Sequence, residues 1–82
     1  MSKPRKDIIL LRTVADRLRT IRKEKGVSQR IVYIDTEIHV GRIEQGRKNL
    51  TLSTLAILCD YYGITLEELF RGIKINSKDL WE

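Results

Sequence analysis

The sequence predicts a compact all-α domain of five short helices. Apolar residues recur at intervals of three and four along several stretches, and no stretch alternates apolar and polar residues convincingly, as a strand would. Glycines, hydroxyl residues and acidic residues divide these stretches at short intervals, as helix caps do. Short helices with short connections are typical of one small helical domain, and 82 residues suffice for one core.

The first helix is expected from about Asp7 to Lys25. Its apolar residues lie on one face and are Leu11, Val14, Ala15, Leu18 and Ile21. Gly26 follows two lysines, and a glycine after basic residues is the usual end of a helix. Residues 1–9 form a basic segment that is expected to be mobile.

The second and third helices are expected to be joined by a tight turn. Ser28 has the chemistry of an N-cap for a second helix that runs to about Ile34. Asp35 and Thr36 are turn and cap residues, so Thr36 is expected to cap a third helix that runs to about Gln45.

The fourth and fifth helices have clear capping signals. Thr51 is expected to cap the fourth helix and Gly63 to close it. Thr65 and Glu68 have the spacing of a capping box, which places a fifth helix at about 66–70. The expected inward face of the fourth helix consists of Leu52, Leu55, Ala56, Leu58 and Cys59.

The tail, residues 72–82, is more apolar than a disordered segment requires. Its large apolar residues are Ile73, Ile75, Leu80 and Trp81. The tail is therefore expected either to pack on the body of the domain or to cover a partner subunit.

The charge is unevenly distributed along the chain. Residues 1–49 hold 13 Lys and Arg against 6 Asp and Glu, a balance of +7, whereas residues 50–82 hold 3 against 5, a balance of −2. A basic half of this kind indicates a surface for a polyanion such as nucleic acid. The alternative is an ordinary charged helix exterior with a basic tail.

Several function classes find no support in the sequence. One cysteine permits no intrachain disulfide, and no apolar signal-peptide run is present, so a reducing cytoplasm is the expected location. The longest uncharged run, from Asn49 to Cys59, is too short and too polar to span a bilayer. His39 is the single histidine and has no companion at ligand spacing, so neither a metal, nor a cofactor, nor enzymatic activity is expected.

A resemblance to a known family lies in two segments, "LRTIRKEKGVSQ" (18–29) and "IHVGRIEQGRKNLTLSTLAILCDYYGITLEELF" (38–70). In content and order they closely resemble the phage-repressor/Cro (XRE) family of helix-turn-helix DNA-binding domains. The resemblance implies a phage-repressor-like five-helix domain over residues 10–71, usually dimeric. Its second helix would cross the DNA backbone and its third helix would lie in the major groove.

The resemblance also implies which residues face the bases, namely Glu37, Ile38, Gly41 and Arg42. An arginine can donate two hydrogen bonds to guanine, a glutamate can accept one from cytosine N4, and a glycine lets the helix approach closely. Ile38 could touch a thymine methyl group or belong to the core, and the core is the preferred alternative. Val40 and Ile43 match core positions of the family.

A second set of residues is expected to contact phosphates. Gln29 and Arg30 open the second helix, where free N–H groups favour an anion, although Arg30 could instead belong to a solvated first turn. For His39, phosphate contact and plain exposure are equal alternatives. The complete set is Gln29, Arg30, Thr36, His39, Arg47, Lys48 and Asn49, of which the last three match the family's phosphate-clamping loop.

Two further expectations concern how the third helix is held. The resemblance pairs Arg22 with Glu44, and a partly buried Arg–carboxylate pair would set the angle between two helices. Ser28 and Glu44 are 16 positions apart, about three fewer than in the family, and three residues turn a helix by roughly 300°. The shortening is expected to fall in the second helix or the turn and to leave the helix faces similar.

The favoured function is therefore a sequence-specific transcription regulator that binds a palindromic operator in double-stranded DNA as a homodimer. No small-molecule ligand or membrane contact is expected. The alternative is a protein-interaction or antitoxin-like module of the same fold, which the apolar tail and Tyr61-Tyr62 favour.

Overall fold

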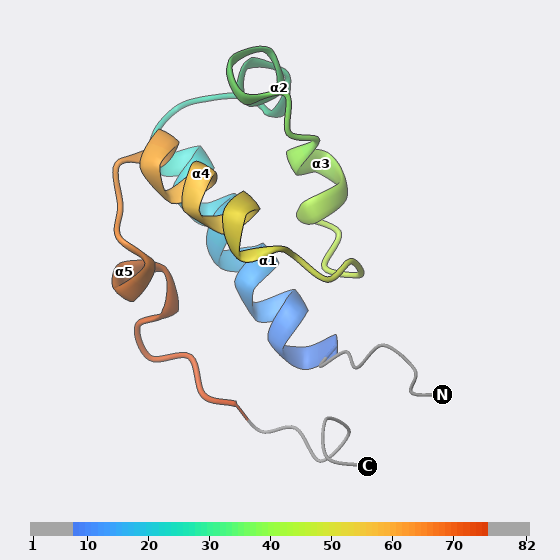
Figure 1. Ribbon diagram of the computed structural model, residues 1–82, viewed down its shortest axis with the longest axis vertical. Coiled ribbons are helices and arrows are strands. Elements are labelled where there is room, and N and C mark those ends of the chain that lie inside the picture. The colour runs from blue at the N-terminus through green and yellow to red at the C-terminus, as the bar shows by residue number, and fades with distance from the viewer. Residues whose placement is uncertain (1–7, 76–82) are drawn as a thin grey trace.

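The computed structural model describes residues 8–75, and the five helices found there are α1 (Ile8–Glu24), α2 (Gln29–Thr36), α3 (Val40–Ile43), α4 (Leu52–Tyr62) and α5 (Leu66–Phe70). No strand occurs in this range, so the all-α, five-helix prediction is confirmed. In Figure 1, α3 and α5 lie on opposite sides of the pair formed by α1 and α4, and α2 stands at one end. Most of the basic segment 1–9, as well as Leu80 and Trp81, falls outside the described residues.

Side-chain caps set the starts of three helices, as the sequence predicts. The Ser28 hydroxyl accepts a hydrogen bond from the Ile31 N–H at 3.1 Å, and the Thr51 hydroxyl accepts one from the Thr54 N–H at 3.1 Å. Thr65 and Glu68 form a reciprocal capping box, with both bonds at 3.0 Å. Each bond satisfies one of the backbone donors that a helix start leaves unpaired.

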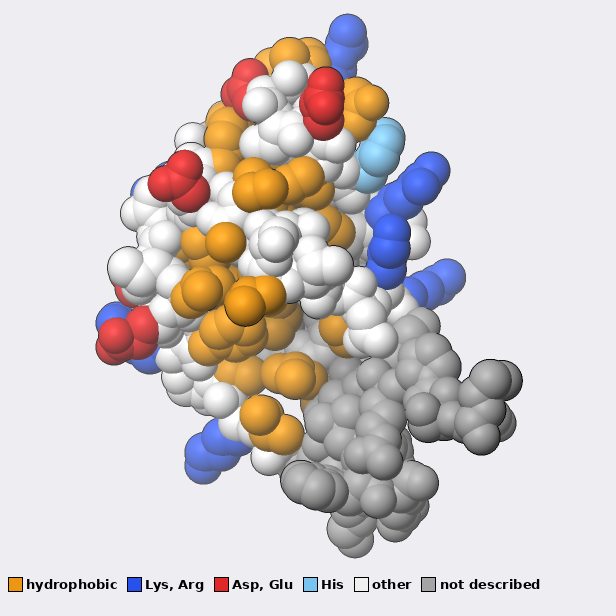
Figure 2. All heavy atoms as spheres, viewed as in Figure 1, with side chains coloured by type: hydrophobic (Ala, Val, Ile, Leu, Met, Phe, Trp, Pro, Cys, Tyr) orange, Lys and Arg blue, Asp and Glu red, His pale blue; other side chains and the backbone are white. Residues whose placement is uncertain are grey.

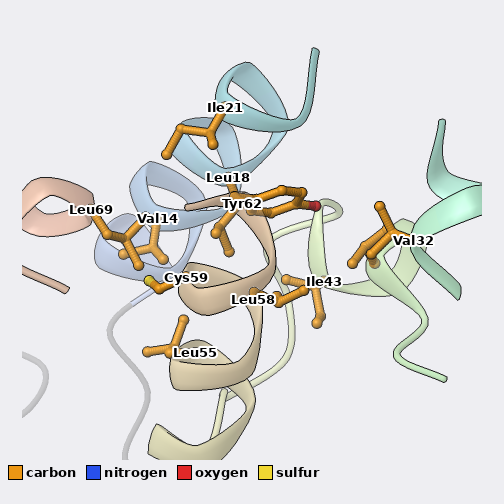
Figure 3. Packing of buried hydrophobic residues seen from close by; sticks show 11 residues of the cluster. Val14, Leu18, Ile21, Val32, Ile43, Leu55, Leu58, Cys59, Tyr62 and Leu69 are labelled. Carbon is orange, nitrogen blue, oxygen red and sulfur yellow. The ribbon is translucent and has the colours of Figure 1, made fainter. Parts of the chain in front are cut away.

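All five helices contribute to one apolar core, which Figure 3 shows around the side chains of Leu18, Leu58 and Tyr62. The prediction for α4 was wrong at two positions, because Leu52 is 70% exposed and Ala56 is also exposed. The buried face of α4 is instead Leu55, Leu58, Cys59 and Tyr62. Leu52 is the first residue of α4 and its side chain is exposed, although its helical spacing from Leu55 and Cys59 had grouped it with the buried face.

Two residues of the apolar core, Cys59 and Tyr62, carry a polar group. Burial raises the pKa of the Cys59 thiol, which fits its role as a small apolar filler. Burial and the nearby Glu44 carboxylate raise the pKa of Tyr62 to about 12, so the phenol stays protonated at neutral pH. Its hydroxyl has no hydrogen-bond partner within the described part of the chain.

The contact that holds α5, a helix of only five residues, was not predicted from the sequence. The Arg17 guanidinium on α1 donates hydrogen bonds to the carbonyl oxygens of Leu69, at 3.0 Å, and of Arg71, at 3.1 Å. These carbonyls lie at the C-terminal end of α5, where a helix has unpaired acceptors. After α5, Ile73 packs against the core, whereas Ile75 is 71% exposed.

Gly46 allows the loop after α3 to pack on α1. Its φ is +73°, and a Cβ there would lie 3.1 Å from the Arg12 Cα and 3.5 Å from the Ala15 Cβ. Gly26 has the same φ of +73°, but a Cβ there would meet nothing within 4 Å. The two glycines therefore share a left-handed backbone conformation, but only Gly46 is packed against another part of the protein.

We expect Gly46→Ala to lower the free energy of unfolding by about 3 kcal/mol, since steric overlap adds to the left-handed backbone strain. Gly26→Ala has the strain alone and should lose only about 1 kcal/mol. Urea denaturation of the two variants measures the difference. Equal losses would show that the contact between the loop and α1 contributes nothing.

Candidate nucleic-acid interface

The connection from α2 to α3 differs from the sequence prediction. α2 continues to Thr36, where the hydroxyl donates to the Val32 carbonyl at 2.7 Å and accepts from the Ile38 N–H at 3.1 Å. Thr36 therefore ends α2 and does not cap α3, because its hydroxyl bonds back into its own helix. Glu37 follows with φ +62°, a left-handed conformation that closes the helix.

The third helix is consequently shorter than expected. It comprises four residues, Val40–Ile43, in place of the predicted span from Thr36 to Gln45. α2 has eight residues and α3 has four, and the placement of the shortening in the second helix or the turn stays a prediction. The turn is formed by residues 37–39, and His39 is the N-cap of α3 without a side-chain cap bond.

Two of the four expected base-facing residues therefore do not lie on α3. Glu37 is exposed, but it belongs to the end of α2. Ile38 is half-buried and packs against the core, which is the alternative that the sequence preferred for it. Val40 and Ile43 are buried as predicted, so the inner face of α3 is correctly assigned.

Gly41 and Arg42 lie on α3, but they have different surroundings. A Cβ at Gly41 would lie 3.1 Å from the Gln29 Oε1, so this glycine leaves room for the Gln29 amide. The sequence suggested instead an approach to DNA. Arg42 is exposed, and its guanidinium is the strongest candidate for contact with a base edge.

A buried ion pair joins α3 to α1. Arg22 Nε donates to Glu44 Oε2 at 2.7 Å, and Arg22 Nη2 donates to Glu44 Oε1 at 3.0 Å. The side chains are 10% and 4% exposed, and Arg22 Nη1 also donates to the Val27 carbonyl at 2.9 Å. The hydrogen bond to Glu44 holds the pKa of Arg22 above its ordinary value. The structure thus contains the pair that the resemblance implies.

Gln29 belongs to the same network. Its Nε2 donates to Glu44 Oε1 at 3.0 Å, so its amide links α2 to the ion pair. Sequence reasoning placed Gln29 at a phosphate and missed this contact. The two residues are 15 positions apart, and a single sequence does not indicate which residues at such a separation will be in contact.

His39 stacks on Tyr33, a residue that sequence reasoning did not single out. The ring centroids are 4.4 Å apart and the planes meet at 26°. Tyr33 is 42% exposed and His39 is also exposed, so one side of the pair remains open to solvent. The stack restrains the turn between α2 and α3 with two aromatic rings.

Two depressions lie next to each other on this surface. One, of about 370 Å³, has Gln29, Arg30 and Tyr33 on its wall. The other, of about 200 Å³, has Lys48, Asn49 and Thr51 on its wall. His39 and Arg42 line both depressions, so these two side chains form a ridge between them.

Figure 2 shows basic side chains along one edge of the molecule, over α2, α3 and the loop that follows α3. Among the phosphate candidates in this region, Arg30, Lys48 and Asn49 are exposed beside the ridge, and Arg47 is exposed in the same loop. Thr36 is half-buried, and its hydroxyl is engaged inside the protein. The structure therefore brings together most of the cations that the sequence suggested.

Within residues 8–75, no helix is long and apolar enough to cross a membrane. In the same range, no three His, Cys, Asp or Glu side chains are grouped so that they could hold a metal ion.

A model of the helix-turn-helix domain matches residues 13–71. The chain belongs to the helix-turn-helix domain family. The resemblance to phage-repressor/Cro (XRE) DNA-binding domains is thereby confirmed at the level of the family and the fold.

This helix-turn-helix domain is also similar to a curated protein, the HTH-type transcriptional regulator DdrOP3 of Deinococcus deserti. The two are 34% identical over 64 residues, which cover 74% of this chain and 50% of the relative. The chain thus spans about half the length of the curated relative that it matches. No solved structure matches this helix-turn-helix domain.

Proposed function

We propose that residues 10–71 form the DNA-binding unit of a sequence-specific transcription regulator that binds a palindromic operator as a homodimer. The observation that carries the proposal is the ridge of His39 and Arg42 between two depressions with basic walls. The major groove is about 12 Å wide and has a phosphate backbone on each side. A central ridge with cations on both sides complements that pattern of charge and shape.

The short α3 concentrates base contact on few residues. Arg42 can donate two hydrogen bonds to guanine O6 and N7, the commonest specific contact in the major groove. Arg30 lies on one side of the ridge and Lys48 on the other, where they can contact the two phosphate backbones. The name of the relative, a transcriptional regulator, supports a regulatory role for such binding.

Homodimer formation is supported by apolar side chains outside the basic edge. Leu52 and Ile57 on α4 are 70% and 49% exposed, and Phe70 on α5 is 37% exposed. A symmetric dimer would present two ridges to successive major grooves, about 34 Å apart, and so require a palindromic site. The same apolar residues favour the second candidate, a protein-interaction or antitoxin-like module in which DNA binding is secondary.

Selection from a random duplex library tests the proposal. We expect a palindrome with half-sites about one helical turn apart. With about six phosphate contacts, the logarithm of the binding constant should fall with the logarithm of salt concentration with a slope of roughly −5. A chain that binds no duplex at low salt and co-purifies with a stoichiometric protein partner would support the second candidate instead.

A further inference from the structure

We infer that His39 contacts a purine base directly and that Tyr33 is the residue that positions it. This inference rests on the proposed DNA binding and adds a specificity-determining residue to it. The starting point is the late beginning of α3, which removes positions 37 and 38 from the helix. Glu37 closes α2 and Ile38 packs on the core, so the next side chain along the chain is that of His39.

The geometry places His39 beside Arg42 on the ridge. The two residues are three positions apart across the start of α3, and both line both depressions. Side chains three positions apart lie on one face of a helix. A base edge that reaches Arg42 therefore has the imidazole as its neighbour.

Gln29 and Thr36, which lie near His39, use their side chains in hydrogen bonds within the protein, and the His39 imidazole has no such bond among the described residues. As the N-cap of α3, His39 makes no side-chain cap bond, whereas Gln29 and Thr36 are engaged inside the protein. An imidazole N–H can donate to purine N7, which every base pair presents in the major groove. A donor at this point distinguishes a purine from a pyrimidine on the contacted strand.

The stack with Tyr33 explains how one imidazole in a turn can be selective. Ring centroids 4.4 Å apart, with planes at 26°, restrain the plane of the imidazole against α2. A side chain that is ordered before binding loses less entropy when it binds. Tyr33 lines only the depression on the α2 side, so it supports the imidazole from behind the ridge.

The test uses the duplex that is enriched most strongly in the selection, with each purine replaced in turn by its 7-deaza analogue, which removes N7 alone. Wild type should lose about 3- to 10-fold in affinity at one purine of each half-site, because of the lost bond to His39. His39→Ala should bind the unmodified duplex about 3- to 10-fold more weakly and lose nothing more at that purine. Any loss at a guanine bound by Arg42 should persist in His39→Ala, which provides an internal control.

Tyr33 is tested by the same readout. Tyr33→Phe keeps the stacked ring and should retain the full 7-deaza loss at the purine of His39. Tyr33→Ala should reduce that loss and leave the loss at the guanine of Arg42 unchanged, a pattern that general destabilisation does not produce. Urea midpoints close to that of wild type confirm that the variants are folded.

Two results would overturn the inference while DNA binding stands. One is an unchanged set of 7-deaza losses in His39→Ala, and the other is an equal loss of affinity for the selected duplex and for random duplexes, as a phosphate contact gives. If wild type binds no duplex at all, both the proposed function and this inference fail.

Discussion

Glu44→Ala is expected to lower the free energy of unfolding by about 3–5 kcal/mol. The substitution leaves the guanidinium of Arg22, a residue that is 8% exposed, without its bidentate partner. A buried charge without a partner is far more costly than the intact pair, and Gln29 loses its acceptor as well. A domain of this size has a total stability of only about 4–12 kcal/mol, so the substitution should remove a large share of it.

Urea denaturation followed by circular dichroism measures this loss. The matched control is Glu24→Ala, which removes an exposed glutamate of α1 and should change the free energy of unfolding by less than about 0.5 kcal/mol. The double variant Arg22→Met, Glu44→Leu removes both charges and should recover most of the lost stability. A loss below about 1 kcal/mol in Glu44→Ala would mean that water reaches Arg22 and replaces the carboxylate.

The second large effect concerns DNA selectivity. We expect Arg42→Ala to lower affinity for the selected operator by about 10- to 100-fold, since a bidentate contact with guanine contributes about 1–3 kcal/mol of discrimination. Affinity for random duplexes should fall much less, so the ratio between operator and random binding should shrink. Competition binding of the two duplexes at one salt concentration gives this ratio.

Two comparison variants separate charge from geometry. Arg42→Lys keeps the charge but loses the bidentate fork, so it should lose selectivity almost as fully as the alanine variant. Lys48→Ala lies on the wall of a depression and should weaken all duplexes alike, with a salt slope about one unit smaller. If Arg42→Ala keeps the wild-type ratio of operator to random binding, Arg42 does not contact a base.

The local chemistry of the chain predicted most of the fold. The caps at Ser28, Thr51 and Thr65 and the stop at Gly63 were predicted correctly, because each depends on residues within one turn of the helix end. Leu52 was misplaced because helical spacing does not tell how much of a helix's first turn meets the core. The contact of Arg17 with α5 was missed, since it joins residues more than 50 positions apart.

The candidate site was predicted less completely than the fold. The basic residues were found from composition and resemblance, and Arg42 remains the leading candidate for a base contact. The turn was misassigned because Asp35-Thr36 has the chemistry of a cap, while the structure uses the Thr36 hydroxyl inside α2. Tyr33 was missed because an aromatic residue on a short helix does not by itself indicate a function. Its role depends on the position of the His39 ring, which the sequence does not show.

The sequence by itself determined the helical class, the starts of α2, α4 and α5, the inner faces of most helices and the basic edge, because these follow from spacing, capping and charge along the chain. Only the tertiary structure decided where α2 ends and α3 begins, how Gln29 is used and which ring supports His39. Each of these depends on contacts that compete with local preference: the bond from Thr36 to Val32, the bond from Gln29 to Glu44 and the stack of His39 on Tyr33. Such competition is resolved by packing in three dimensions, so the shape of the proposed DNA-binding surface is set by the fold and not by the local motif.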